Sequence, residues 1–161
     1  MNRISCLFVS LVLLVNIFAC SGYKPIFSSN GSNFKIANFS IGGDKNLSKK
    51  IINKLIISFK INEDKKDTKN IDVFIKVIKN KKATSKDTAG KILEYKVQLN
   101  TEIIVKDYLT EKQILNEKLL FSSIYKIQDQ YSETIELENR TTEDLLDKIF
   151  QDLLIKLSQN S

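Results

Sequence analysis

Residues 93–106 read LEYKVQLNTEIIVK, and this stretch decides the fold. Apolar or aromatic side chains occupy almost every odd position from Leu93 to Val105, and polar or charged side chains occupy most even positions. Because successive side chains of a strand point to opposite faces, this pattern predicts a long β-strand with one buried and one solvated face. We therefore expect a sheet with one wet face at the centre of the fold.

Shorter alternating segments flank this strand. Residues 34–41 and 71–77 predict two strands before it, and residues 112–127 predict a fourth, which follows a turn at 109–111 and pairs with the third as a hairpin. Residues 80–91 are polar and predict a loop between the second and third strands. The lysines of this predicted loop are Lys81, Lys82, Lys86 and Lys91.

Two segments have helical periodicity. A four-spaced apolar stripe predicts an amphipathic helix over about 45–60, and Asp44 is suited to cap its first turn. A second stripe predicts a C-terminal helix over 145–157. Residues 132–143 either extend that helix or form a loop that ends at a cap on Thr141 or Thr142. The order strand, helix, three strands, helix predicts an α+β fold, with two helices packed on one face of a four-stranded mixed, mostly antiparallel sheet.

The first nineteen residues have the features of a secretory signal. Arg3 precedes an apolar run that is shorter than the about 20 residues of a transmembrane helix. Ile17-Phe18-Ala19-Cys20 is similar to the bacterial lipobox, which implies cleavage before Cys20 and lipidation of its sulfur. Cys6 leaves with the signal, so Cys20 would be the only cysteine of the mature chain. We expect a signal peptide at 1–19, a lipidated anchor and linker at 20–33, and a single domain at 34–161.

Composition narrows the classes of function. The chain has no histidine, which excludes Ser–His–Asp and Cys–His catalysis and imidazole metal sites. Its acidic residues are scattered over polar positions, so we expect no enzyme and no metal site. A formal net charge of +6 reflects 25 Lys and Arg against 19 Asp and Glu, and either codon bias or an anionic partner would explain it. The export signal argues against nucleic acid as that partner.

Three motifs along the mature chain suggest a family. Residues 20–27 read CSGYKPIF and resemble an opening of Cys, Gly, aromatic, any residue, Pro, Leu and Tyr. EYKV follows at 94–97 in the long strand, and FSSIY stands at 121–125 before the leucine-rich helix. In this order and spacing, the motifs resemble the LPS-assembly lipoproteins (LptE) of the alphaproteobacterial type.

The resemblance implies a fold of two helices on a four-stranded sheet and a place in the outer membrane, anchored by the lipid on Cys20. It also implies that the protein fills the lumen of an LptD-like β-barrel, assists barrel assembly and helps insert lipopolysaccharide into the outer leaflet. No cofactor is implied other than the covalent lipid. In the family, basic residues after the second strand bind the lipid, which makes the predicted loop a candidate site. The candidate lipopolysaccharide-binding residues are Lys81, Lys82, Lys86 and Lys91. An accessory lipoprotein subunit of another outer-membrane lipid transport system remains the alternative.

Overall fold

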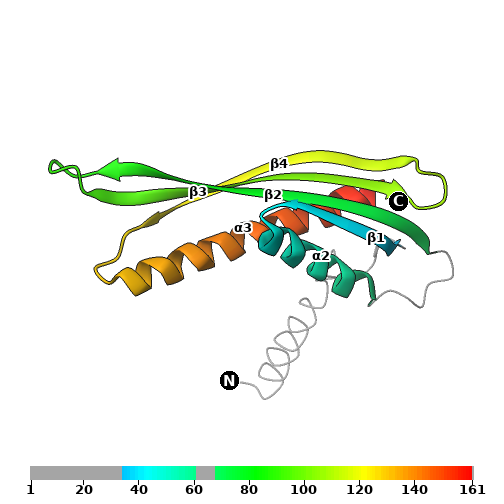
Figure 1. Ribbon diagram of the computed structural model, residues 1–161, viewed down its shortest axis with the longest axis horizontal. Helices are drawn as coiled ribbons and strands as arrows, with labels where there is room; N and C mark the ends of the chain where they lie inside the picture. Colours follow the sequence, from blue (N-terminus) through cyan, green and yellow to red (C-terminus); the bar gives the residue numbers. More distant parts are fainter. Residues whose placement is uncertain (1–33, 61–67, 161) are drawn as a thin grey trace, which may run out of the picture. The chain divides into compact units, whose positions relative to one another are not determined.

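A computed structural model describes residues 34–60 and 68–160, which form six elements of secondary structure (Figure 1). The predicted signal peptide, the linker and Cys20 lie outside the described residues. The elements are β1 (Phe34–Gly43), α2 (Lys45–Lys60), β2 (Lys69–Lys86), β3 (Ile92–Asp107), β4 (Gln113–Lys126) and α3 (Tyr131–Gln159).

The four strands form one sheet in the order β1-β2-β3-β4. β1 runs parallel to β2, and the other two neighbouring pairs are antiparallel. α2 packs on β1 and β2, and α3 packs on β4 and β3, so that both helices cover the same face (Figure 1). The predicted α+β arrangement is confirmed. We call the two sides of the sheet the covered face and the open face.

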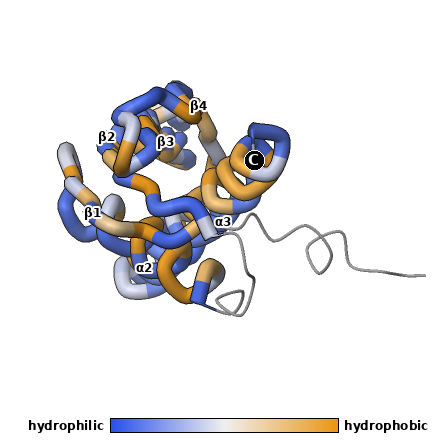
Figure 2. The backbone as a smooth tube through the Cα atoms, turned by 90° about the vertical axis from the view of Figure 1, so that its right-hand side faces the viewer, coloured by the Kyte–Doolittle hydropathy of each residue, from blue (hydrophilic) through white to orange (hydrophobic). Residues whose placement is uncertain are grey.

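The core lies between the helices and the covered face. Figure 2, seen from the right-hand end of Figure 1, shows hydrophobic residues along both helices. Both predicted helical stripes are buried, as are the odd positions of β3 from Val97 to Val105. The largest fully buried side chains are Ile51, Ile52, Leu55, Ile71, Ile75, Leu99, Ile103, Leu145, Leu146, Ile149, Leu153 and Leu157. Apolar burial of this kind is the main favourable contribution to folding.

The corner between β1 and α2 is fixed by short polar contacts. Asp44 Oδ1 accepts hydrogen bonds from the backbone N–H groups of Asn46 and Leu47, both at 3.1 Å, which confirms the predicted cap. β1 continues two residues past its predicted end, to Gly43, whose φ of 64° favours glycine. A Cβ atom at Gly43 would lie 2.1 Å from the Val77 carbonyl oxygen.

Two boundaries differ from the sequence-based expectation. The predicted loop over 80–91 is wrong in its first half, because β2 continues to Lys86 and pairs with β3 as far as Ile92. α3 begins at Tyr131, so the residues before 145 extend the helix. Thr141 and Thr142 are buried within α3, where they cap nothing, and Thr142 Oγ1 donates to the Glu138 carbonyl oxygen at 2.8 Å.

Candidate functional site

The longer β2 separates the predicted lysines. Alternation along the strand places Lys81 on the covered face and Lys82 on the open face. Lys86 is the last residue of β2, and Lys91 lies in the turn that leads to β3. The four lysines therefore do not form one loop cluster.

Lys81 takes part in a polar cluster beneath α3. Its Nζ lies 2.5 Å from Glu138 Oε2 and 4.2 Å from the centre of the Tyr95 ring. Lys79 Nζ lies 2.7 Å from Glu138 Oε1, and the Tyr125 hydroxyl donates to Glu138 Oε2 at 2.7 Å. We call these five residues the Glu138 cluster. It links β2, β3 and β4 to the first half of α3.

The electrostatics of the Glu138 cluster favour its charged form. Burial alone would raise the pKa of Glu138, but hydrogen bonds from Lys79, Lys81 and Tyr125 outweigh burial and lower the pKa to about 2. Burial alone would lower the pKa of Lys81, but Glu138 and Tyr125 outweigh it and raise the pKa. Lys81 is thus committed to a contact inside the folded domain.

Lys82 lies in a different environment on the open face. It stands directly opposite Lys96 on β3, and Lys96 in turn stands opposite Ile124 on β4. Lys126 follows two residues after Ile124, opposite Glu94. Among residues 34–60 and 68–160, no carboxylate forms an ion pair with Lys82, Lys96 or Lys126, which we call the open-face lysines.

Like charges directly opposite each other on neighbouring strands are destabilising, because their Cβ atoms lie only about 5 Å apart. A bound anion between Lys82 and Lys96 would remove this repulsion. Lysine ammonium groups act as compact point charges and are common ligands of phosphate. The open-face lysines are therefore a candidate anion site.

The turn after β2 adds two more exposed lysines beside this site. Asp87 Oδ1 accepts from the backbone N–H groups of Ala89 and Lys91, both at 2.9 Å, and Gly90 has a φ of 82°. These contacts hold a tight turn and leave the Lys86 and Lys91 side chains exposed. Lys82, Lys86 and Lys91 are thus exposed at this end of the sheet without the ion pair to Glu138 that holds Lys81.

Apolar side chains also lie on the open face, where Ile124 stands opposite Lys96, and Ile78 and Leu120 stand opposite Asn100, four residues along β3 from Lys96. Ile78, Leu120 and Ile124 have exposed fractions of 42%, 64% and 55%. Ile78 and Leu120 also line a shallow hollow of about 290 Å³ between Lys76 and Lys118. A surface that combines ammonium groups with exposed aliphatic side chains fits an amphiphilic anion better than a simple salt ion.

Two members of this candidate site, Lys96 and Lys126, are absent from the set predicted from the sequence. Alternation along β3 does put Lys96 on the wet face, but its proximity to Lys82 depends on the strand register. Lys82 and Lys96 become paired only because β2 continues beyond Asn80, where the sequence predicts a loop.

Two kinds of feature are absent from the described residues. Within 34–60 and 68–160, no three Cys, Asp or Glu side chains are grouped so as to hold a metal ion. None of the helices in these ranges combines the length and the apolar character needed to cross a bilayer.

Comparisons with known proteins give structural likeness only. No protein-family model matches the chain, and no curated protein matches its sequence. A crystallised lipoprotein of Caulobacter crescentus aligns with a TM-score of 0.56 at 10% identity, over 83% of this chain and 93% of its own.

Two further solved structures have the same fold. A minor lipoprotein of Acinetobacter baumannii aligns with a TM-score of 0.56 at 12% identity, over 78% of this chain and 92% of its own. Lipoprotein B of Nitrosomonas europaea aligns with a TM-score of 0.54 at 13% identity, over 75% of this chain and 80% of its own. At these identities, the likeness shows a shared fold.

Proposed function

We propose that this chain is an outer-membrane lipoprotein that fills the lumen of an LptD-like β-barrel, assists the assembly of that barrel and helps deliver lipopolysaccharide to the outer leaflet. The lipid on Cys20 would hold it at the membrane. The role is one of binding, without catalysis and without a cofactor other than that lipid.

The observation that carries the proposal is the open face of the sheet. Both helices pack on the other side, so four strands present lysines, aliphatic side chains and the carboxylates of Glu94 and Glu102 to the surroundings, with lysines in the majority. Lipopolysaccharide combines anionic phosphates with acyl chains and is therefore complementary to this surface in both charge and polarity. The lipobox-like start and the fold shared with three bacterial lipoproteins agree with the assignment.

A barrel lumen is lined by polar side chains, and a protein that fills it needs a largely polar surface. The outer side of α2 meets this need, because lysines and asparagines alternate there with its buried stripe. The open-face lysines would then meet the phosphates of lipopolysaccharide at one end of the sheet.

The partner is tested by purification of the tagged mature protein from detergent-solubilised membranes, followed by mass spectrometry. An outer-membrane barrel of the LptD type is expected in stoichiometric amount. Recovery of the components of another lipid transport system would favour the alternative, an accessory lipoprotein of that system. Recovery of neither would contradict both assignments.

Lipid recognition is tested with the double variant Lys82→Gln/Lys96→Gln. We expect weaker binding to purified lipopolysaccharide, because two adjacent ammonium groups are removed. The matched control is Lys49→Gln/Lys148→Gln, which makes the same change of charge at exposed positions on α2 and α3.

Binding by the wild type should also fall as salt rises, since exposed charges are screened over about 8 Å at physiological ionic strength. If both double variants lose the same affinity, Lys82 and Lys96 contribute only through net charge. If neither variant loses affinity, Lys82 and Lys96 do not bind lipopolysaccharide.

A further inference from the structure

The strand register gathers several chain segments at one end of the domain. Phe34 pairs with Lys69, so β1 and β2 begin together, and Ile71 pairs with Asp107 at the end of β3. The Phe34 and Phe59 rings lie 6.3 Å apart, so α2 ends there too. Figure 1 shows these segments at its right-hand side. We call this the anchor end, because the chain leaves it from Phe34 toward Cys20.

The turn between β3 and β4 lies at the anchor end, and we call it the tip. Asp107 Oδ1 accepts hydrogen bonds from the backbone N–H groups of Leu109 and Thr110, at 3.0 and 2.8 Å, and from the Thr110 hydroxyl at 3.0 Å. The Tyr108 N–H donates to the Asn70 carbonyl oxygen at 3.0 Å. These contacts define the conformation of the turn in the folded domain.

This turn presents apolar side chains to the outside. Leu109 has an exposed fraction of 81% and Tyr108 one of 45%. Neither the hydrogen bonds of Asp107 nor the core requires an aliphatic side chain at position 109. A well-ordered turn that exposes a leucine and a tyrosine side by side fits a contact with an apolar or interfacial environment.

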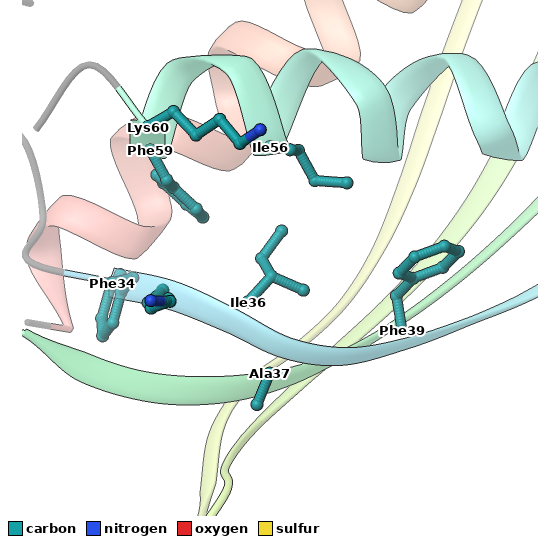
Figure 3. A pocket seen from close by; sticks show the side chains of 8 residues that line it. Phe34, Ile36, Ala37, Phe39, Ile56, Phe59 and Lys60 are labelled. Carbon is teal, nitrogen blue, oxygen red and sulfur yellow. The ribbon is translucent and has the colours of Figure 1, made fainter. Parts of the chain in front are cut away.

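More apolar surface lies nearby at the same end. A groove of about 200 Å³ lies between β1 and the last turns of α2, and Figure 3 shows Ile36 and Ile56 there beside the buried rings of Phe34 and Phe59. Ile57, in the last turn of α2, has an exposed fraction of 62%.

Exposed lysines lie at the same end of the domain, together with the exposed Glu111 of the turn itself. They come from the end of α2, the start of β2, the end of β3 and the start of β4. They are Lys60, Lys69, Lys106 and Lys112. Leucine and tyrosine at an end of the domain where exposed lysines outnumber the acidic residue suit the headgroup region of an anionic bilayer, where aromatic rings settle at the interface and lysines meet lipid phosphates.

The length of the tether favours the same environment. Cys20 precedes Phe34 by fourteen residues, which span at most about 48 Å at about 3.4 Å per residue. β3 has 16 residues and is about 54 Å long at the same rise. A lipid on Cys20 therefore keeps the anchor end, rather than the opposite end of the sheet, within easy reach of the bilayer.

We propose that the anchor end contacts the interfacial region of the bilayer that holds the lipid, with Leu109 and Tyr108 inserted among the headgroups. This inference rests on the proposed lipidation of Cys20 and adds a second, protein-mediated membrane contact. The contact would fix the orientation of the domain relative to the leaflet that holds the lipid, with the open-face lysines at the end remote from the headgroups of that leaflet.

The chain has no tryptophan, so Leu109→Trp in the mature lipidated protein creates a single fluorescent reporter at the tip. The matched control is Tyr131→Trp, at a position of 80% exposure where α3 begins, at the opposite end of the domain. Both proteins are mixed with vesicles of phosphatidylethanolamine and phosphatidylglycerol whose acyl chains carry bromine. Vesicle flotation reports membrane attachment separately from the fluorescence.

With vesicles, the emission of the Leu109→Trp protein should shift to shorter wavelength and be quenched by bromine, whereas that of the Tyr131→Trp protein should change in neither respect. Flotation without quenching at position 109 overturns the inference and leaves the anchor intact. Quenching without flotation supports the inference and contradicts the anchor. If the protein shows neither flotation nor quenching, the inference is overturned. Equal quenching at positions 109 and 131 overturns it as well. The inference is also overturned if the emission of the Leu109→Trp protein shifts only when barrel protein is added and bromine does not quench it. In that case position 109 contacts protein.

Discussion

Glu138 shows how one polar side chain can help to hold a helix to a sheet. Its carboxylate accepts hydrogen bonds from Lys79, Lys81 and Tyr125, which come from two different strands. The Glu138 side chain is only 14% exposed, and the Lys79 and Lys81 side chains are 24% and 35% exposed. If the carboxylate were lost, water could therefore solvate the two ammonium groups only in part. Removal of the charge therefore leaves two ammonium groups in a poorly solvated site.

We predict that Glu138→Gln lowers the free energy of unfolding by about 2 kcal/mol, measured by urea denaturation. The control is Glu136→Gln, which removes a carboxylate paired with Arg140 on the exposed side of the same helix. Because that pair is well solvated, the control should cost less than about 0.5 kcal/mol. Equal losses in the two variants would contradict a special role for the Glu138 cluster.

The same carboxylate predicts a dependence of stability on pH. The pKa of Glu138 is about 2 in the folded chain, below its ordinary value of 4.5. A lowered pKa means that the group stabilises the fold above pH 4.5 and loses this contribution as pH falls toward 2. The difference in unfolding free energy between the wild type and Glu138→Gln should therefore shrink over this range. A constant difference from pH 6 to pH 2 would show that Glu138 has an ordinary pKa.

At the scale of elements, the apolar stripe of α3 makes a direct prediction. Leu153 is fully buried, whereas Ile155, two residues later on the same helix, is 45% exposed. Leu153→Asp places a charge in the core and should destabilise the domain by about 3–5 kcal/mol. Ile155→Asp should cost less than about 1 kcal/mol. Thermal melts followed by circular dichroism measure both, and an unchanged midpoint for Leu153→Asp would mean that the stripe is not core.

The elements also show what residue patterns can and cannot predict. α2, β3 and β4 follow from apolar periodicity because each buries one face against the core. β1 follows from a shorter apolar pattern, although Phe34 alone is buried in it and Phe39 is 51% exposed. The second half of β2 does not, because residues 79–86 read KNKKATSK and offer no apolar alternation. They form a strand because β3 extends opposite them and satisfies their backbone hydrogen bonds. Pairing with a distant segment, not local preference, decides this stretch.

The first half of α3 is a similar case. Residues 131–144 lack the leucine stripe of the second half, so the sequence leaves helix and loop equally open. The helix continues there because Glu138 reaches back to two strands and Thr134 Oγ1 accepts from the Gln128 N–H at 2.9 Å. Polar tertiary contacts of this kind have no signature in the local sequence.

At the scale of the whole molecule, the candidate site depends on the same pairing. Lysines are abundant throughout the chain, so their number alone does not separate a binding surface from an ordinary solvated one. The register places Lys82 against Lys96 and leaves Lys81 to Glu138, although the two neighbours are equivalent in the sequence. Which lysines form a surface is therefore a property of the fold.

The last prediction concerns the link between this domain and the membrane. Cys20→Ser should abolish incorporation of a palmitate analogue in growing cells, because serine cannot form the thioether that carries the lipid. Cys6→Ser is the matched control, since it changes the other cysteine of the chain inside the predicted signal and should leave labelling intact. Label that persists in Cys20→Ser would contradict the lipoprotein assignment, and loss of label in both variants would point to a defect in export rather than in lipidation. Because the core and the Glu138 cluster lie within residues 34–160, the unlabelled variant should melt at the same temperature as the lipidated protein. The variant is expected to accumulate as an uncleaved or a soluble precursor.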